Sequence, residues 1–220
     1  GERIQDAGIP HFSMDNVSAA SEMVHHLYQQ GARSFLILGS THTRATSSAG
    51  ALRQRGIEKA LAELGLDSWA WRSVEVSPWT AEGAESALGQ WLESNTLPDA
   101  IFTMNDLLGA GALRALSRAQ VRVPQDVLVS SWDDTVLSRF STPALTTISP
   151  DTHAIAHEAV AGLIALIEGN GRTGEPGEAK GPDTDTTETL NPAHSNQPST
   201  QVSDVTVSYT LTVRESTKRV

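Results

Sequence analysis

Hydrophobic positions change their spacing several times between residues 17 and 148. Segments with apolar residues three or four positions apart are typical of helices with one buried face, and they alternate here with short apolar runs typical of strands. The expected helices cover 17–30, 49–64, 81–94 and 105–120, and the expected strands cover 33–40, 71–77, 99–104 and 127–132. Strands separated by helices pair in parallel through right-handed crossovers. The predicted fold class is therefore α/β, a parallel sheet flanked by helices.

Residues at the predicted helix ends support these boundaries. Ser47 or Ser48, and also Thr80, can cap a helix because a hydroxyl oxygen accepts a hydrogen bond from a free N–H group of the first turn. Gly31 and Gly65 follow the last periodic positions of two helices, where glycine commonly ends a helix.

The pattern changes near residue 148. A short β-prone run at 144–149 leads to a strongly apolar helix over 153–169. Residues 170–204 are rich in Gly, Pro, Thr, Ser and Asn and hold six acidic against two basic residues. Such a segment buries too little apolar surface to offset its ordering entropy, so we predict a disordered polar excursion. A strand over 205–213 and a charged tail follow.

Composition narrows the classes of function. The net charge of −10 argues against nucleic-acid binding by this chain alone, because phosphate contacts need clustered Lys and Arg. The absence of cysteine excludes disulfides, thiolate nucleophiles and cysteine-based zinc sites. No apolar run reaches the ~18 residues of a membrane span, and the first residues do not resemble a signal peptide. We expect a soluble, cytoplasmic protein without a metal or other cofactor.

Candidate chemistry gathers after the predicted strands. Open parallel sheets bind ligands at the carboxyl ends of their strands, which directs attention to 40–44, 77–80, 105–106 and 132–134. The last of these holds Trp132 and the acidic pair Asp133 and Asp134. The two acids are neighbours rather than a pair flanking a scissile bond, and no GxSxG, P-loop or HExxH motif is present, so we do not expect an enzyme.

Several segments, taken in order, resemble the ligand-binding region of the LacI/GalR family of bacterial transcription regulators. They are SMDN, HLYQQGARSFLILGS, LRQRGIEKALAELGL, PDAIFTMNDLLGAGALRAL, VPQDVLVSSWDDT, STPALTTISPDTHAIAHEAV and VRESTKRV. The resemblance covers about 13–168 and 205–217. Two departures stand out: the helix-turn-helix and most of an N-terminal subdomain precede these segments in the family and are not in this sequence, and 170–204 is longer and more polar than the family's connector.

The resemblance implies a type I periplasmic-binding-protein-like fold and an order of parts. Residues 1–16 would be a remnant of the N-terminal subdomain and 17–145 the C-terminal ligand-binding subdomain. Residues 146–169 would be a strand and helix crossing toward the N-terminal subdomain, 170–204 the polar excursion, and 205–220 the final strand and tail. The crossover helix would then expose an apolar face, which should pair with another copy, pack in a way foreign to the family, or be unstable.

Four residues match ligand-contacting positions of the family. Arg53 would donate to ligand oxygens, and Asp133 would accept from ligand hydroxyls across the cleft. Asn105 would offer its amide, and Trp79 would stack on a sugar or a base. Each has a plainer alternative. Arg53 could be a solvated helix arginine, with Arg55 as a rival for the ligand role, and Asp133 could be a turn aspartate. Asn105 could be a helix cap, and Trp79 could cover the edge of the core.

The remaining candidates have weaker support. His42 and Arg44 follow the first strand and could reach an anionic ligand, although a lone histidine is more often structural. Asp106 is expected to cap a helix or to be structural, and the turn role fits Asp134 better than Asp133. Trp69, Trp71 and Trp132 are expected to be packing residues.

As a function, the resemblance implies a non-catalytic effector sensor. A small polar ligand, most simply a sugar, would bind between two subdomains and alter DNA binding by a homodimer, with DNA contacted only through an N-terminal helix-turn-helix. The alternatives are a periplasmic-type solute-binding protein and a degenerate fragment without a ligand.

Overall fold

A computed structural model describes residues 10–40, 48–171 and 204–219 of the chain. Two of the sequence predictions concern residues outside these ranges. They are the polar excursion, of which 172–203 is not described, and the candidates His42 and Arg44. No helix among the described residues has the length and hydrophobicity needed to cross a membrane.

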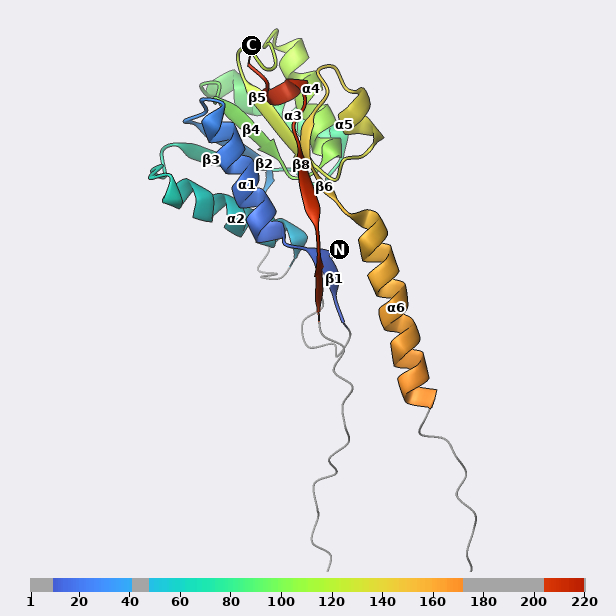
Figure 1. Cartoon of the computed structure of the whole chain (residues 1–220). Helices are drawn as coiled ribbons and strands as arrows, with labels where there is room; N and C mark the ends of the chain where they lie inside the picture. The colour runs from blue at the N-terminus through green and yellow to red at the C-terminus, as the bar shows by residue number, and fades with distance from the viewer. Residues whose placement is uncertain (1–9, 41–47, 172–203, 220) are drawn as a thin grey trace, which may run out of the picture.

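Strands and helices alternate along most of the described chain (Figure 1). The strands are β1 (Phe12–Met14), β2 (Phe35–Ser40), β3 (Trp71–Glu75), β4 (Ala100–Thr103), β5 (Leu128–Trp132), β6 (Thr146–Pro150), β7 (Val205–Val207) and β8 (Tyr209–Thr212). The helices are α1 (Asn16–Gln29), α2 (Ala49–Glu63), α3 (Ala81–Ser94), α4 (Asp106–Arg118), α5 (Val136–Phe140), α6 (Thr152–Gly171) and the short 3₁₀ helix η1 (Glu215–Thr217).

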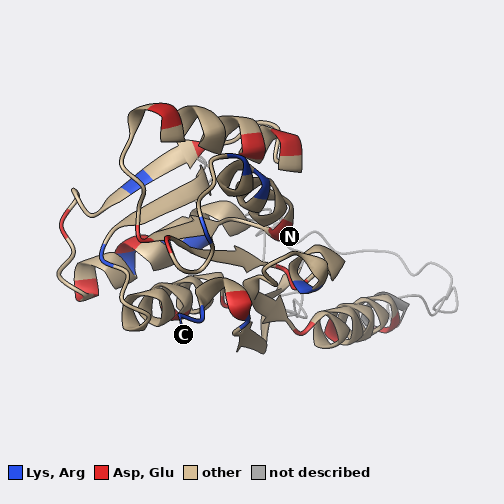
Figure 2. Cartoon of the chain, turned by 90° about the horizontal axis from the view of Figure 1, so that it is seen from above, with Lys and Arg blue, Asp and Glu red and all other residues tan. Residues whose placement is uncertain are grey.

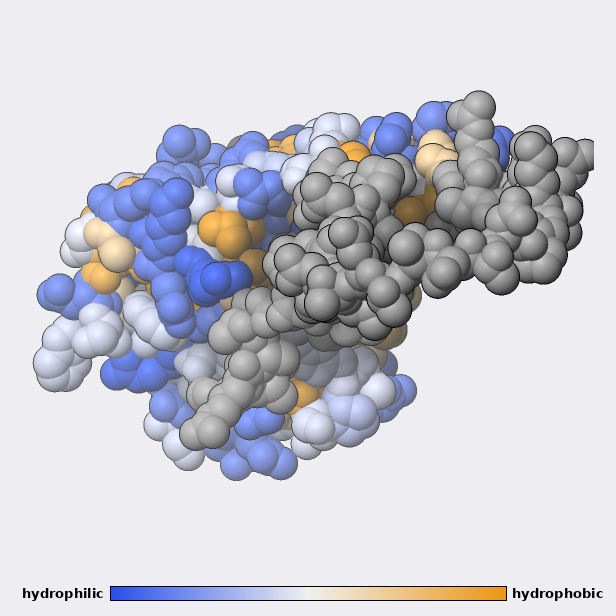
Figure 3. Space-filling model, turned by 90° about the horizontal axis from the view of Figure 1, so that it is seen from below, coloured by the Kyte–Doolittle hydropathy of each residue, from blue (hydrophilic) through white to orange (hydrophobic). Residues whose placement is uncertain are grey.

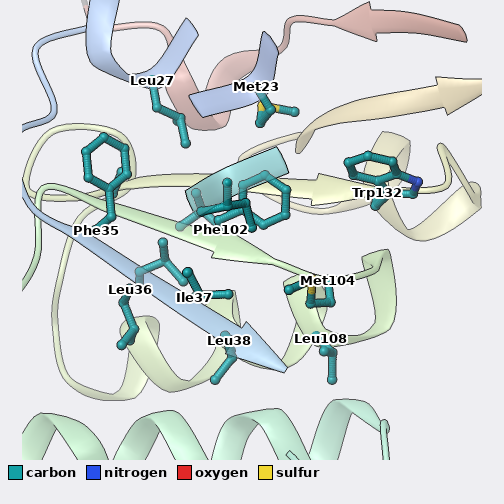
Figure 4. Packing of buried hydrophobic residues seen from close by; sticks show 14 of the residues in the cluster. Met23, Leu27, Phe35, Leu36, Ile37, Leu38, Phe102, Met104, Leu108 and Trp132 are labelled. Carbon is teal, nitrogen blue, oxygen red and sulfur yellow. The ribbon is translucent and has the colours of Figure 1, made fainter. Parts of the chain in front are cut away.

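A six-stranded sheet in the order β3-β2-β4-β5-β6-β8 organises the main body. All neighbours pair in parallel except β8, which runs antiparallel to β6. Helix α1 packs beside α2, and α3 packs beside α4 (Figure 1). Figure 4 shows side chains of α1 on one side of the sheet and Leu108 of α4 on the other. The predicted α/β class with a parallel sheet covered by helices is confirmed.

The core lies between the sheet and these helices (Figure 4). Strand β2 is buried along its whole length because it lies inside the sheet with helices on both faces. Glycine permits the closest helix contacts: a Cβ on Gly111 of α4 would lie 2.1 Å from the carbonyl oxygen of Ala81 in α3. The body therefore depends on backbone-to-backbone proximity as well as on apolar burial.

Most predicted elements occur near their expected positions, and the cap of α2 is Ser48, whose hydroxyl accepts from the N–H of Ala51 at 3.2 Å. Strand β1 and helix α5 were not predicted. The single strand predicted at 205–213 is wrong, because two strands separated by Ser208 join different sheets: β7 pairs with β1 and β8 pairs with β6. Apolar alternation alone does not distinguish one long strand from two short ones.

A second part, the extension, consists of α6 and the two-stranded parallel sheet β1–β7 (Figure 1). The helix contacts this sheet where Gly162 faces the ring of Phe12. Four large aliphatic side chains of α6 are exposed, namely Val160, Leu163, Ile164 and Ile167. Hydrophobic surface is visible between hydrophilic residues in the view from below (Figure 3). The exposed apolar face predicted for this helix is thus present.

Candidate functional site

The carboxyl ends of β2, β4 and β5 lie side by side because these strands are neighbours and run in parallel. This edge of the sheet, which we call the rim, carries Ser40, Met104 and Trp132, all buried. The backbone after β5 then turns sharply: Asp133 has φ 102° and Asp134 has φ 49°, both in the left-handed region that side chains disfavour. Such strain persists only where the surrounding contacts impose it.

Arg53 extends from α2 to the rim, and only 9% of the residue is exposed. Its Nε donates to Oδ1 of Asn16 at 3.2 Å, and its Nη1 donates to the carbonyl oxygen of Met104. The guanidinium carbon lies 4.3 Å from the centre of the Trp132 ring. The arginine is therefore fixed at the rim, and the alternative of a solvated helix arginine does not describe it.

Asp133 faces this arginine, with Oδ1 at 3.7 Å from Nη2 of Arg53. That distance allows an ion pair but is too long for a direct hydrogen bond. Burial lowers the pKa of Arg53 to about 10, against the opposing effect of Asp133 and Asp106. Burial also raises the pKa of Asp133, although the charge of Arg53 acts in the other direction. Both pKa shifts indicate that burial disfavours the charged forms of Arg53 and Asp133 more than their mutual attraction favours them.

Asn105 follows β4 and forms the N-cap of α4, where its Oδ1 accepts from the N–H of Leu108 at 2.9 Å. Its amide Nδ2 has no hydrogen-bond partner among the described residues, so the cap leaves a donor beside Met104 at the rim. Its neighbour Asp106 is fully buried and accepts from Ser131, Thr135 and Thr147. That network has a structural role, as the sequence predicted.

Asp134 has a structural role that differs from that of its neighbour. It forms an ion pair with Arg214, just after β8, and accepts from Ser149 of β6 at 3.1 Å and Ser138 of α5 at 3.2 Å. Burial raises its pKa, but the hydrogen bonds and the charge of Arg214 outweigh this effect, so the pKa lies below its usual value. The two aspartates thus point to different partners.

Tryptophans occupy three different environments. Trp79, a predicted ligand contact, lies between β3 and α3, is half-buried and packs against the core edge; its role toward a ligand stays a prediction. The packing role expected for Trp69 is wrong, since 82% of this residue is exposed. Trp71 packs against the core, and Trp132 is fully buried beside Phe102.

One contributor to the rim, Asn16, is not predicted from the sequence. It orients Arg53 and stands in the SMDN segment, which the sequence analysis uses only for the family resemblance. Two buried polar atoms of rim residues also have no hydrogen-bond partner among the described residues: Oγ of Ser40 and Nε1 of Trp132. Such atoms each cost about 1–3 kcal/mol when unsatisfied, which favours a polar occupant here.

The charges fit a site for a small polar ligand rather than a metal. No cluster of His, Asp and Glu suited to a metal ion occurs in the part of the chain that the structure describes. Figure 2 shows basic residues distributed over several elements rather than gathered on one surface helix. The rim instead combines one buried cation, one half-exposed carboxylate and neutral polar groups.

Comparison with known proteins places this geometry in a family. Residues 24–184 match the profile of the periplasmic binding protein-like domain. The HTH-type transcriptional repressor CytR of Escherichia coli K12 is 28% identical over 167 residues, covering 73% of this chain and 46% of the repressor. The chain thus spans about half the length of the curated relatives it matches.

Solved structures of related regulators have the same fold as this chain. A LacI-family transcriptional regulator from Sanguibacter keddieii is 30% identical, with a TM-score of 0.78 over 99% of this chain and 72% of the other. The complex of the regulator CelR with cellobiose has the same fold, with a TM-score of 0.72, 23% identity and coverage of 97% and 55%.

These relatives are regulators and not enzymes, in agreement with the predicted non-catalytic role, and they favour a regulator over the solute-binding alternative. The chain belongs to the LacI family of transcriptional regulators and contains their periplasmic-binding-protein-like effector-binding domain.

Proposed function

We propose that the rim binds a small polyhydroxylated effector, most simply a sugar, through Arg53 and Asp133. The 3.7 Å gap between Nη2 of Arg53 and Oδ1 of Asp133 carries this proposal. A hydroxyl placed beside both groups accepts from the arginine and donates to the carboxylate. It replaces a loose ion pair by two charge-assisted hydrogen bonds, which are stronger than neutral ones.

Other groups around this pair suit the same ligand class. The amide of Asn105 has a donor to spare, and the indole of Trp79 offers a flat apolar surface for a sugar ring. The cellobiose bound to the related fold of CelR supports a saccharide. A neutral ligand also fits the rim electrostatically, because Arg53 already has a carboxylate partner.

In the complete regulator, the ligand would act by shifting a conformational equilibrium. Residues 17–145 would form the C-terminal subdomain, and 146–169 would cross toward the N-terminal subdomain, with the ligand between the two. Different affinities for open and closed arrangements change their populations, and the typical coupling to a second site is about 1–3 kcal/mol. The second site would be a helix-turn-helix that binds DNA in the cytoplasm. The relative CytR is described as an HTH-type repressor, after this motif.

A homodimer is part of this proposal, and α5 offers a surface for it. Val136, Leu137 and Phe140 are exposed on this short helix, with Phe140 at 81%. A cavity of about 520 Å³ lies beside them, lined in part by Ala110 and Leu113 of α4. Across a twofold axis, the usual symmetry of homodimers, the Phe140 ring of each copy would pack against the hollow of the other.

Calorimetric titration of the chain with cellobiose, ribose and glucose tests the ligand. We expect one of these sugars to bind and Arg53→Ala and Asp133→Ala each to weaken binding more than tenfold, since each change removes one charge-assisted hydrogen bond to the ligand and leaves the other charge without its partner. Arg122 and Asp126 form a matched control pair at the surface, with Nη2 and Oδ1 2.6 Å apart. Their alanine variants should bind normally. Unchanged affinity in the rim variants would exclude the proposed contacts.

Size-exclusion chromatography with light scattering tests the dimer. Phe140→Asp should shift the molecular mass from two copies to one, whereas Ile167→Asp on α6 should leave it unchanged. A monomeric parent chain, or loss of the dimer only on changing α6, would reject α5 as the interface.

A further inference from the structure

We propose that Trp132 is a positioning residue of the rim that acts through Arg53: its indole face holds the guanidinium so that Nη2 is presented to the ligand. This inference rests on the proposed function for its purpose, but not for its geometry. The sequence places Trp132 beside the acidic pair at the end of a strand, but predicts a packing residue there.

Two of the three nitrogens of the Arg53 guanidinium donate hydrogen bonds to other described residues, and the third does not. Nε is committed to Asn16 and Nη1 to the carbonyl of Met104. Among residues 10–40, 48–171 and 204–219, the contact recorded for Nη2 is the one with Oδ1 of Asp133 at 3.7 Å. A guanidinium carries five N–H donors in one plane, so fixing two nitrogens leaves the third directed along a defined line. Those two bonds act within the plane and do little to limit movement perpendicular to it.

Trp132 supplies the missing constraint. The centre of its ring lies 4.3 Å from the guanidinium carbon, within the range of a cation–π contact. A buried guanidinium face has lost water, and the negative face of an aromatic ring compensates the charge while an aliphatic side chain cannot. Without an aromatic ring below it, Arg53 would lower its energy by moving toward solvent.

The indole is itself firmly placed. Trp132 is fully buried and its ring centre lies 6.2 Å from that of Phe102, with the planes inclined at 46°. Both side chains belong to neighbouring strands, β4 and β5, and both are drawn in Figure 4. The two rings are inclined rather than stacked, and the indole is held in place by its burial in the core as a whole.

Substitutions at position 132 separate this role from simple packing. Trp132→Phe keeps a ring, whereas Trp132→Leu removes it. Phe102→Leu is the control, because it weakens the core without removing the contact between Trp132 and Arg53. All three are measured on the whole chain without any ligand, so that failure of the sugar proposal does not affect the result.

The first measurement is the NMR signal of the Arg53 side-chain N–H groups. We expect it upfield of the other arginines in the parent chain, because protons over an aromatic face are shielded. The shift should persist in Trp132→Phe and in Phe102→Leu and should disappear in Trp132→Leu. An unshifted Arg53 signal in the parent chain overturns the proposal, even if the leucine variant does not fold.

The second measurement is the pKa of Asp133, followed through its carboxyl carbon. Arg53 lowers this pKa, so its release should raise it in Trp132→Leu, with no comparable change in Trp132→Phe. If the pKa is the same in the leucine variant as in the parent chain, Trp132 does not position Arg53. A lower melting temperature in Phe102→Leu with an unmoved pKa would show that stability alone does not reproduce the effect.

Discussion

Helices α4 and α6 are both apolar, yet only α4 is covered by the rest of the described chain. Helix α4 buries Leu108, Ala112, Ala115 and Leu116 against the sheet and α3. Helix α6 exposes four large aliphatic side chains, and Gly162 on it lies against the ring of Phe12. The comparison teaches that an apolar pattern specifies a helix locally, whereas its burial depends on what the fold places opposite. The body is stabilised by its own contacts, and the extension is only partly covered.

Truncating one leucine or isoleucine in each helix should give the largest contrast. Leu116→Ala should cost about 2–5 kcal/mol of unfolding free energy, because it leaves a cavity in a closed core. Ile164→Ala should cost less than about 0.5 kcal/mol, because its side chain is half exposed and its neighbours can adjust. Urea denaturation followed by circular dichroism measures both. Equal losses would mean that α6 is covered by something in solution.

A glycine in each helix sharpens the same contrast. In Gly111→Ala the new methyl group would lie 2.1 Å from a backbone carbonyl of α3, so the two helices must separate, at about 1–3 kcal/mol. In Gly162→Ala it would lie 2.6 Å from Cζ at the far end of the Phe12 ring, which can move aside by a turn about its Cα–Cβ bond, while alanine gains up to about 1 kcal/mol of helix propensity. Thermal melts should therefore move down for the first and stay level or rise for the second. A lower melting temperature for Gly162→Ala would show that the ring is fixed.

The joint between the two parts provides a smaller, pH-dependent effect. Asp134 contacts Ser149, which lies in β6, and Arg214, which follows β8; these two strands connect the body to the extension. Because its pKa is depressed in the fold, its contribution is present above its unfolded value near 3.8 and is lost as the pH falls through the folded value. Stability should thus fall below about pH 4, and less steeply in Asp134→Asn, as measured by denaturation at several pH values. Identical slopes would contradict this assignment.

The smallest effect is expected on the exposed face of α6. Ile167→Glu should change stability by less than about 0.5 kcal/mol while reducing nonspecific association, because a charge interrupts an apolar patch. Light scattering as a function of protein concentration measures this association. Glu168→Gln on the same helix is the control: Glu168 is also exposed, and removing its charge should not reduce association. An unfolded Ile167→Glu variant would show that this face is buried after all.

The sequence predicted the layered body well because its signals are local. Period and caps locate α1 to α4, and continuous apolar runs locate β2 and β4. It also placed Arg53, Asn105 and Asp133 near one rim, since strand ends converge in a parallel sheet. It could not supply Asn16 and Trp132 as partners of Arg53, because such contacts join residues 37 or more positions apart. The division of 205–213 into two strands likewise depends on distant pairing.

The ladder between β1 and β7 has a consequence for a chain leaving the ribosome. His11 donates to Asp204, 193 positions later, and Phe12 pairs with Val205 beside it. Closing so long a loop costs entropy that three residues of ladder barely repay. During synthesis β1 must wait for its partner β7 to emerge, and the apolar face of α6 is already exposed by then. Chaperone dependence should accordingly persist until residues 205–207 have left the ribosome.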